Sequence, residues 1–135
     1  MSKFNPSTNI FKNWDKDMYI ATKGEVQLDD DCNEIVTYNQ PFYFGKVNYQ
    51  PLTTKQFEAY IKEYGETENQ VVSCLIDYNK KLFDKFDVAY LYGATPDNEL
   101  KYGANANYKV RAFKPQNTKI MVLLEEIIKE ENQNG

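Results

Sequence analysis

Few side chains of this sequence could carry out chemistry, and histidine is missing from them altogether. Because histidine is the commonest general base and the commonest zinc ligand, its absence removes the usual catalytic pairs and zinc sites. Cys74 has no histidine partner and falls on the apolar face of an expected strand, where a thiol packs as a small hydrophobic group. Cys32 falls in an expected turn. The spacing of the two cysteines matches no zinc motif, so neither is expected to be a nucleophile or a metal ligand.

The acidic run Asp29-Asp30-Asp31 invites comparison with a calcium-binding loop. Asp29 and Asp31, together with Asn33, match the first three liganding positions of an EF-hand. The match fails afterwards, because Glu34 stands where the loop needs glycine and Gln40 stands where a bidentate glutamate is required. Short polar side chains also cap their own backbone in turns, so the run predicts a solvated hairpin turn.

The other acidic pairs give no stronger sign of catalysis. Nothing in the sequence would make Glu66 and Glu68, or Glu125 and Glu126, face each other across a cleft. The sequence contains no glycine-rich phosphate loop, serine-nucleophile elbow or nucleotide-binding fingerprint. It therefore predicts a protein without catalytic residues, metal or cofactor, and not an enzyme.

Aromatic side chains are unusually frequent and gather in one stretch. They make up 15% of the chain, with 11 Tyr and 8 Phe, and many lie between residues 41 and 65. Either a helix in this stretch plugs one end of a barrel with its apolar stripe inward, or the stretch packs on another chain, where Tyr and Phe supply large contact areas. The candidate subunit-interface residues are Tyr43, Phe44, Tyr49, Pro51, Leu52, Phe57, Tyr60 and Tyr64.

Length and composition indicate one globular domain. The chain has 135 residues, of which 41% are hydrophobic and 27% charged. A net charge of −4 argues against a bulk electrostatic grip on nucleic acid or on a membrane surface, because Lys and Arg carry such binding. The most apolar run, residues 120–128, contains two glutamates and is too short to cross a bilayer. Residues 1–15 lack the apolar stretch of a signal peptide, and two cysteines fit a reduced cytoplasmic setting.

Residue patterns in the first half predict a hairpin and then a helix. Residues 19–28 are expected to form a strand with a bulge at Gly24, and residues 34–38 the returning strand. The proline-flanked stretch 41–52 is expected to be extended. A capping box of Thr53 and Gln56 begins the helix, and Gly65 ends it because only glycine adopts the left-handed conformation at little cost.

Alternating apolar residues in the second half predict four more strands. Their ranges are 70–78, 87–92, 107–113 and 119–125. The buried face of the first is expected to hold Val72, Cys74, Ile76 and Tyr78, and that of the third Tyr108, Val110 and Ala112. The last segment also fits a helical stripe, but the short connection 114–118 favours a hairpin.

These elements predict a mainly β fold: a small β-barrel with one short inserted helix and extended N- and C-terminal arms. The expected organisation is an N-terminal arm at 1–17, a single barrel domain at 18–128 with a loop-helix insertion at 44–65, and a C-terminal tail at 129–135. The aromatic residues of the first arm either belong to a frayed terminus or dock on a neighbouring subunit. The arm-docking candidates are Phe4, Phe11 and Trp14.

The second half of the chain resembles a family of phage proteins. The sequence FDVAYLYGATPDN at 86–98, followed by GANANYKV at 103–110, is similar to the head-closure (head-completion or stopper) proteins of tailed bacteriophages. The first hairpin with its acidic turn, the Tyr43-Phe44 pair and YQPLT at 49–53 look similar too. The resemblance spans about residues 19–128 and implies a small β-barrel with an inserted loop or helix.

The resemblance also implies a role in the neck of the virion, after assembly in the cytoplasm of the bacterial host. Copies of the chain would form a six- or twelve-fold ring, with an adaptor or portal ring on the head side and a tail terminator or tail tube on the other. DNA would pass through the channel without specific binding, for which a net charge of −4 is suitable. The insertion at 44–65 would project into the channel or grip the next ring.

Three other functions stay open. The chain could be a different phage part, such as an adaptor, a tail terminator or a tail-completion protein, although adaptors are usually helical. It could be a barrel that binds single-stranded nucleic acid by stacking bases on Tyr and Phe, which predicts salt-sensitive binding to oligonucleotides. A carbohydrate-binding module would also use exposed tyrosines.

Overall fold

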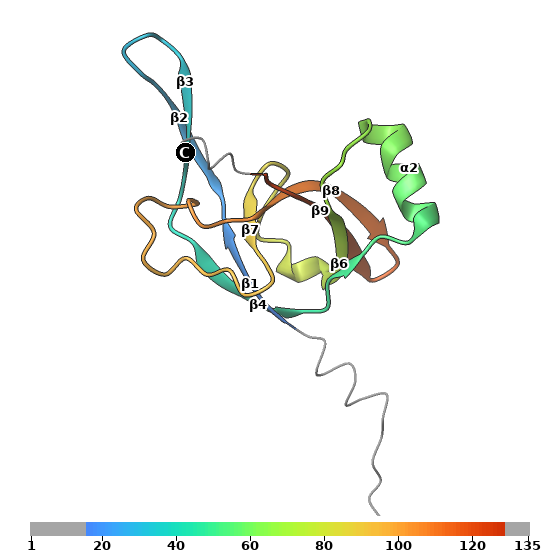
Figure 1. Cartoon of the computed structure of the whole chain (residues 1–135). Helices are drawn as coiled ribbons and strands as arrows, with labels where there is room; N and C mark the ends of the chain where they lie inside the picture. Colours follow the sequence, from blue (N-terminus) through green and yellow to red (C-terminus); the bar gives the residue numbers. More distant parts are fainter. Residues whose placement is uncertain (1–15, 129–135) are drawn as a thin grey trace, which may run out of the picture.

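A computed structural model describes residues 16–128, and Figure 1 shows that strands dominate it. The elements in chain order are β1 (Lys16–Ala21), β2 (Lys23–Leu28), β3 (Glu34–Tyr38), β4 (Phe42–Val47), β5 (Gln50–Pro51), α2 (Thr54–Tyr64), β6 (Val71–Asp77), the 3-10 turn η1 (Tyr78–Lys80), β7 (Val88–Tyr90), β8 (Tyr108–Gln116) and β9 (Lys119–Glu126). The predicted mainly β fold with one helix is confirmed. Residues 1–15 of the expected N-terminal arm, with Phe4, Phe11 and Trp14, and the tail at 129–135 lie outside the described residues.

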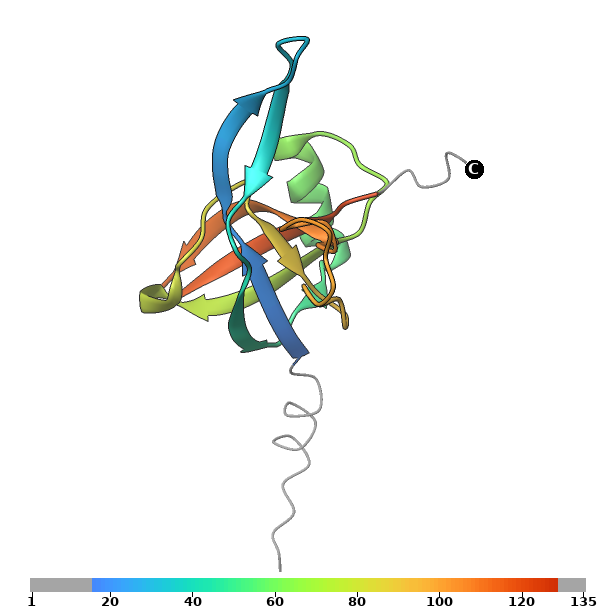
Figure 2. The same cartoon turned by 90° about the vertical axis from the view of Figure 1, so that its left-hand side faces the viewer.

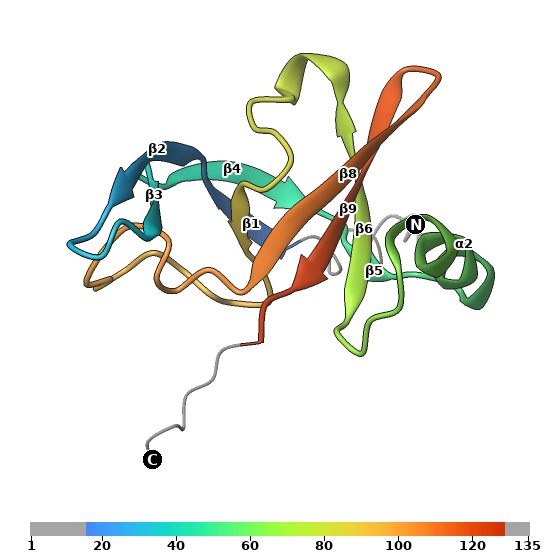
Figure 3. The same ribbon diagram turned by 90° about the horizontal axis from the view of Figure 1, so that it is seen from above.

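Seven antiparallel strands form one curled sheet in the order β4-β1-β7-β8-β9-β6-β5. The curl brings β4 near β6 across the open side, so the sheet makes a half-closed barrel (Figures 1 and 3). Its interior is filled by apolar side chains that alternate along the strands, including Met18, Ile20, Val72, Cys74, Ile76, Tyr108, Val110, Val122 and Leu124. Strand alternation therefore predicted much of the core correctly.

Helix α2 begins and ends where the sequence predicts. The Thr53 hydroxyl accepts a hydrogen bond from the Gln56 backbone N–H, and the Gln56 side chain accepts one from the Thr53 N–H. Gly65 follows with φ +97° and ψ 166°, an extended conformation at positive φ that is essentially confined to glycine and is not the left-handed helical one expected. The helix does not plug the barrel. Its buried face covers the outer side of the sheet, where Tyr60 packs with Ala112 and Leu123.

The predicted strand 19–28 is two strands, because its halves pair differently. β1 pairs with β4 and β7 in the barrel, whereas β2 pairs with β3 in a separate two-stranded sheet. A register shift between Lys23 and Val26 confirms the expected bulge around Gly24. Since β1 starts at Lys16, the last two residues of the expected arm belong to the barrel.

One bulge and two strand ends also differ from the sequence prediction. A bulge at Arg111 turns Ala112 to the helix side of the sheet, so Phe113 packs toward the barrel interior instead. β8 continues through Gln116, and only the next two residues make the turn to β9. Tyr78 leaves the buried face of β6, because the chain turns there into η1, and its side chain is exposed.

Candidate interaction surfaces

The structure distributes the predicted interface residues over separate regions. Tyr49 is buried in the barrel, and its hydroxyl accepts a hydrogen bond of 2.7 Å from the Tyr92 N–H. Phe44 lies in β4 and packs its ring against Phe83. Tyr60 lies on the buried face of α2 and packs with Leu52, Phe57 and Tyr64. Only two of the candidates are classed as exposed: Tyr43 on β4 and Pro51 on β5, at opposite edges of the sheet. The eight residues therefore do not form one continuous surface on the subunit.

A polar network under α2 explains how that helix is held. Both carboxylate oxygens of Glu125 are used: one accepts a hydrogen bond of 2.5 Å from the Tyr60 hydroxyl, and the other accepts bonds from the side chains of Thr67 and Asn69. Arg111 adds a positive charge 3.6 Å from the first oxygen. Burial and the bond to Glu125 raise the pKa of Tyr60 to about 12, so this hydroxyl stays a donor at neutral pH. Glu125 thus has a structural role.

The β2–β3 hairpin, residues 23–38, is the main element that stands away from the barrel (Figures 1 and 2). Val26 pairs with Val36 and Leu28 with Glu34, so these three apolar side chains share one face of the two-stranded sheet. All three are exposed, Leu28 by 64%. The sequence prediction placed these strands in the barrel and missed this surface, although the apolar residues on both sides of the acidic turn were a visible signal.

The hairpin also carries a concentrated negative charge. It holds five acidic side chains and one lysine, a net charge of −4 that equals the formal net charge of the whole chain. At its tip, one oxygen of Asp29 accepts hydrogen bonds from the backbone N–H groups of Asp31 and Asn33. The bond from Asn33 is the main reason that the pKa of Asp29 lies below its usual range. Asp29 therefore caps the turn, as predicted for this acidic run, and no cluster among residues 16–128 has three groups placed to hold a metal ion.

The base of the hairpin is fixed to the barrel by Asp87. This is the only buried charged side chain among residues 16–128, with 5% of its surface exposed. One carboxylate oxygen accepts a hydrogen bond of 2.7 Å from the Lys23 N–H, and the other accepts one of 2.6 Å from the Asp84 N–H. On the other strand, the Tyr38 ring lies so close to Gly103 that a Cβ there would stand 2.7 Å from a ring carbon. The hairpin is therefore held firmly at its root.

A second exposed apolar surface lies on residues 78–86, which connect β6 to β7 and which we call the basic segment. Tyr78, Leu82 and Phe86 are all about half exposed or more, Leu82 by 64%. Lys80, Lys81 and Lys85 lie between them, with Asp84 as the only acid of the segment. Phe86 is held at φ +74°, a strained conformation for an aromatic residue, while its N–H donates to the Val110 carbonyl. The strain is thus maintained by the barrel.

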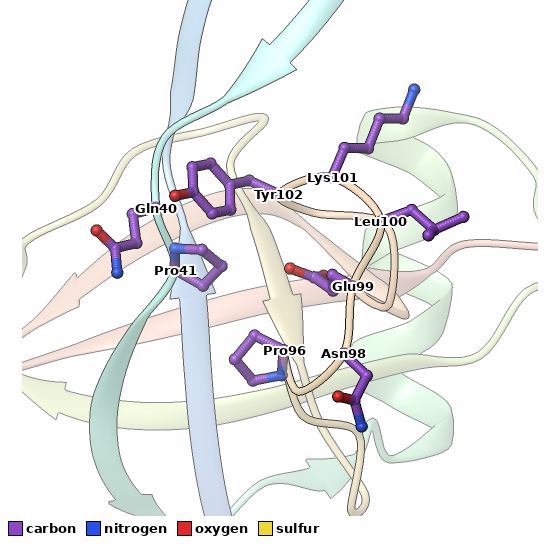
Figure 4. A pocket seen from close by; sticks show the side chains of 8 residues that line it. All are labelled: Gln40, Pro41, Pro96, Asn98, Glu99, Leu100, Lys101 and Tyr102. Carbon is purple, nitrogen blue, oxygen red and sulfur yellow. The ribbon is translucent and has the colours of Figure 1, made fainter.

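An open groove of about 630 Å³ separates the start of β4 from the loop after β7. Figure 4 shows Gln40 and Pro41 on one side and Pro96 to Tyr102 on the other. The loop is held by Glu99, whose carboxylate accepts hydrogen bonds from the buried Tyr90 hydroxyl and the Asn105 N–H. Leu100 is fully exposed beside the groove. The groove offers two prolines, a tyrosine and an exposed leucine, but no group poised for chemistry.

The two cysteines should differ sharply in reactivity. Cys32 is exposed in the hairpin turn, whereas Cys74 is buried and burial raises its pKa to about 12. Because the thiolate is the reacting form, we expect a maleimide to modify Cys32 alone in the native protein and both cysteines in denaturant. Intact mass spectrometry would count the added groups. Two added groups under native conditions would contradict the packing of β6.

Comparison with known proteins finds no relative: no family model, curated protein or solved structure matches this chain. None of the helices within residues 16–128 has the length and apolar character that crossing a membrane requires.

Proposed function

We propose that this chain is a structural protein of the tailed-bacteriophage neck, a head-closure subunit whose ring closes the DNA-filled head and gives the tail a docking platform. The observation that carries the proposal is the placement of exposed apolar side chains on two protruding segments, residues 23–38 and 78–86, of a small half-closed barrel. Apolar side chains concentrated on protrusions are typical of surfaces that become buried on assembly. The sequence resemblance to head-closure proteins supports the same role.

The proposed partners are other copies of the chain, an adaptor or portal ring on the head side, and a tail terminator or tail tube on the other. DNA would pass through the ring without specific binding, since a chain with net charge −4 has little attraction for phosphate groups. We assign the projecting role to the hairpin instead of the predicted insertion at 44–65, because residues 44–47 are part of β4 and α2 packs on its own sheet.

Deleting the gene from the genome that encodes this chain should test the function directly. We expect particles with DNA-filled heads and separate, complete tails, because the joining platform would be missing. A plasmid copy should restore joining, and an epitope tag on it should be seen by electron microscopy at the head–tail junction. A tag at the far end of the tail, or normal particles without the chain, would contradict the proposal. Salt-sensitive binding of the purified chain to oligonucleotides would favour the nucleic-acid-binding alternative.

A further inference from the structure

We infer that copies of this chain associate head to tail, with the acidic hairpin of one copy docked on the basic segment of the next. The inference deepens the proposed function by naming the two surfaces that would join subunits within the ring, and it rests on that function only for its biological setting. The contact itself is a property of the purified chain.

Opposite charge is the first reason to pair these two surfaces. The side chains of Asp30 and Asp31 at the hairpin tip make no hydrogen bond or ion pair within residues 16–128. Lys80 and Lys85 on the basic segment likewise have no hydrogen bond or close ion pair there. Lys81, by contrast, pairs with Asp84 at 2.8 Å. Lys80 lies within electrostatic reach of Asp77, and Lys85 within reach of Glu63, so these lysines are compensated only at longer range. Each surface therefore presents charges that have no close partner in their own subunit, and the two sets are complementary.

Matching apolar surface is the second reason. The hairpin offers Val26, Leu28 and Val36 on one face, next to its acidic tip. The basic segment offers Tyr78, Leu82 and Phe86 next to its lysines. Each surface thus combines three exposed apolar side chains with charged residues nearby in the sequence, and an interface with a buried centre and a polar rim has both kinds of residue. Burial of both sets in one contact would remove much of the apolar surface that the single subunit exposes.

The geometry makes such a contact heterologous. The hairpin and the basic segment are different elements, and Figure 3 shows them leaving the barrel in different directions. One copy can therefore dock on a second through its hairpin while a third docks on its basic segment. A contact of this kind does not stop at a dimer, because each added copy presents a further unoccupied surface until a ring closes.

Charge reversal gives the main test, with purified full-length chains studied by sedimentation velocity. The double variants D30K/D31K and K80E/K85E should each weaken self-association about 100-fold, because like charges would then face each other. The variant with all four changes should associate as the wild type does, and so should an equal mixture of the two double variants. A misfolded variant could not regain self-association when the opposite charges are also reversed. Raised salt should weaken the wild-type contact, because it screens the attraction between the charges. The control variant K101E reverses a charge on the loop beside the groove, outside both docking surfaces, and should leave association unchanged.

Cross-linking through the native thiol of Cys32 gives a second, independent test. The variant Leu82→Cys adds a thiol to the basic segment, and a short bismaleimide should then produce a ladder of dimers, trimers and larger species. Leu100→Cys, at a fully exposed position elsewhere, and the combination of Leu82→Cys with Cys32→Ser should give no ladder.

The results separate this inference from the proposed function. Charge rescue together with the ladder supports the contact, whatever the electron microscopy of particles shows. Unaltered association of the double variants, failure of the fourfold variant to restore it, or absence of the cross-linked ladder from the Leu82→Cys variant at every protein concentration would overturn the contact. Those results would leave a neck position found by epitope tagging intact, whereas a tag away from the neck would overturn only the function.

Discussion

Replacing Asp87 with alanine should lower the free energy of unfolding by about 3 kcal/mol, because two partly buried backbone N–H groups would lose their acceptor. The carboxylate bonds the Lys23 N–H at the root of the hairpin and the Asp84 N–H in the basic segment. Alanine supplies no oxygen to either group, and the site is too buried for water to replace the carboxylate easily. Urea denaturation would measure the loss.

Asp87→Asn is the matched control for this experiment. The amide keeps one oxygen of the carboxylate, so it can satisfy one N–H while its NH2 group faces the other, and we expect roughly half of the loss. Hydrogen exchange should also show faster exchange along β2 and β3 in the alanine variant, since their anchor to the barrel is gone. If Asp87→Ala unfolds at the same urea concentration as the wild type, this buried carboxylate does not stabilise the hairpin root.

Replacing Glu125 with glutamine should cost about 2 kcal/mol at neutral pH, since hydrogen bonds to an ionised acceptor are stronger than those to an amide. Thr67 and Asn69 both donate to one oxygen of Glu125, and Tyr60 donates to the other. If the glutamine oxygen faces Thr67 and Asn69, its NH2 group faces the Tyr60 hydroxyl, which then loses its acceptor. If the amide is turned the other way, its NH2 group faces Thr67 and Asn69, which both donate to Glu125 in the native network. Part of the network under α2 is therefore lost in either orientation. Thr67→Val would remove one donor to Glu125, together with the hydroxyl oxygen that accepts from the Asn69 N–H, and should cost less.

The same variant should also have a distinct dependence on pH. Burial alone would raise the pKa of Glu125, but the hydrogen bonds from Tyr60, Thr67 and Asn69 and the charge of Arg111 outweigh it and leave the pKa below the ordinary 4.5. A carboxyl whose pKa is lower in the folded state stabilises the fold above its unfolded pKa, and this stabilisation is lost as the pH falls through the folded pKa. The difference between wild type and Glu125→Gln should therefore be constant above about pH 5 and shrink on further acidification. A difference that is unchanged down to about pH 2 would mean that Glu125 is not held ionised by its neighbours.

Local signals in the sequence predicted the elements well. The capping box at Thr53 and the glycine at 65 determine the ends of α2, because both act on the backbone within one turn. Alternation predicted β6, and alternation together with the short connection at 114–118 predicted β9, since each strand turns one face to the barrel interior along most of its length.

The sequence could not show what packs against the apolar face of each helix or strand. The stripe of α2 fits a barrel end, another chain or the outer side of a sheet equally well, and only the tertiary arrangement places Tyr60 against Leu123. The break between β1 and β2 has no strong local signal, because both halves have strand-like residues and differ only in their partners. The exposed surfaces on the hairpin and on the basic segment were missed for the same reason: alternation shows that a face is apolar, but not that it stays uncovered.

The position of Asp87 has a consequence for how accurately copies of the chain could be arranged. A single carboxylate joins the root of the hairpin to the segment proposed to receive the neighbouring hairpin, so the two cannot easily tilt independently. In a closed circle of identical units, any error in the turn from one unit to the next is repeated at every step and prevents the last unit from meeting the first. The hydrogen bonds of Asp87 would keep that turn the same in every unit. Loss of these bonds would yield open spirals whose curvature varies from one to the next.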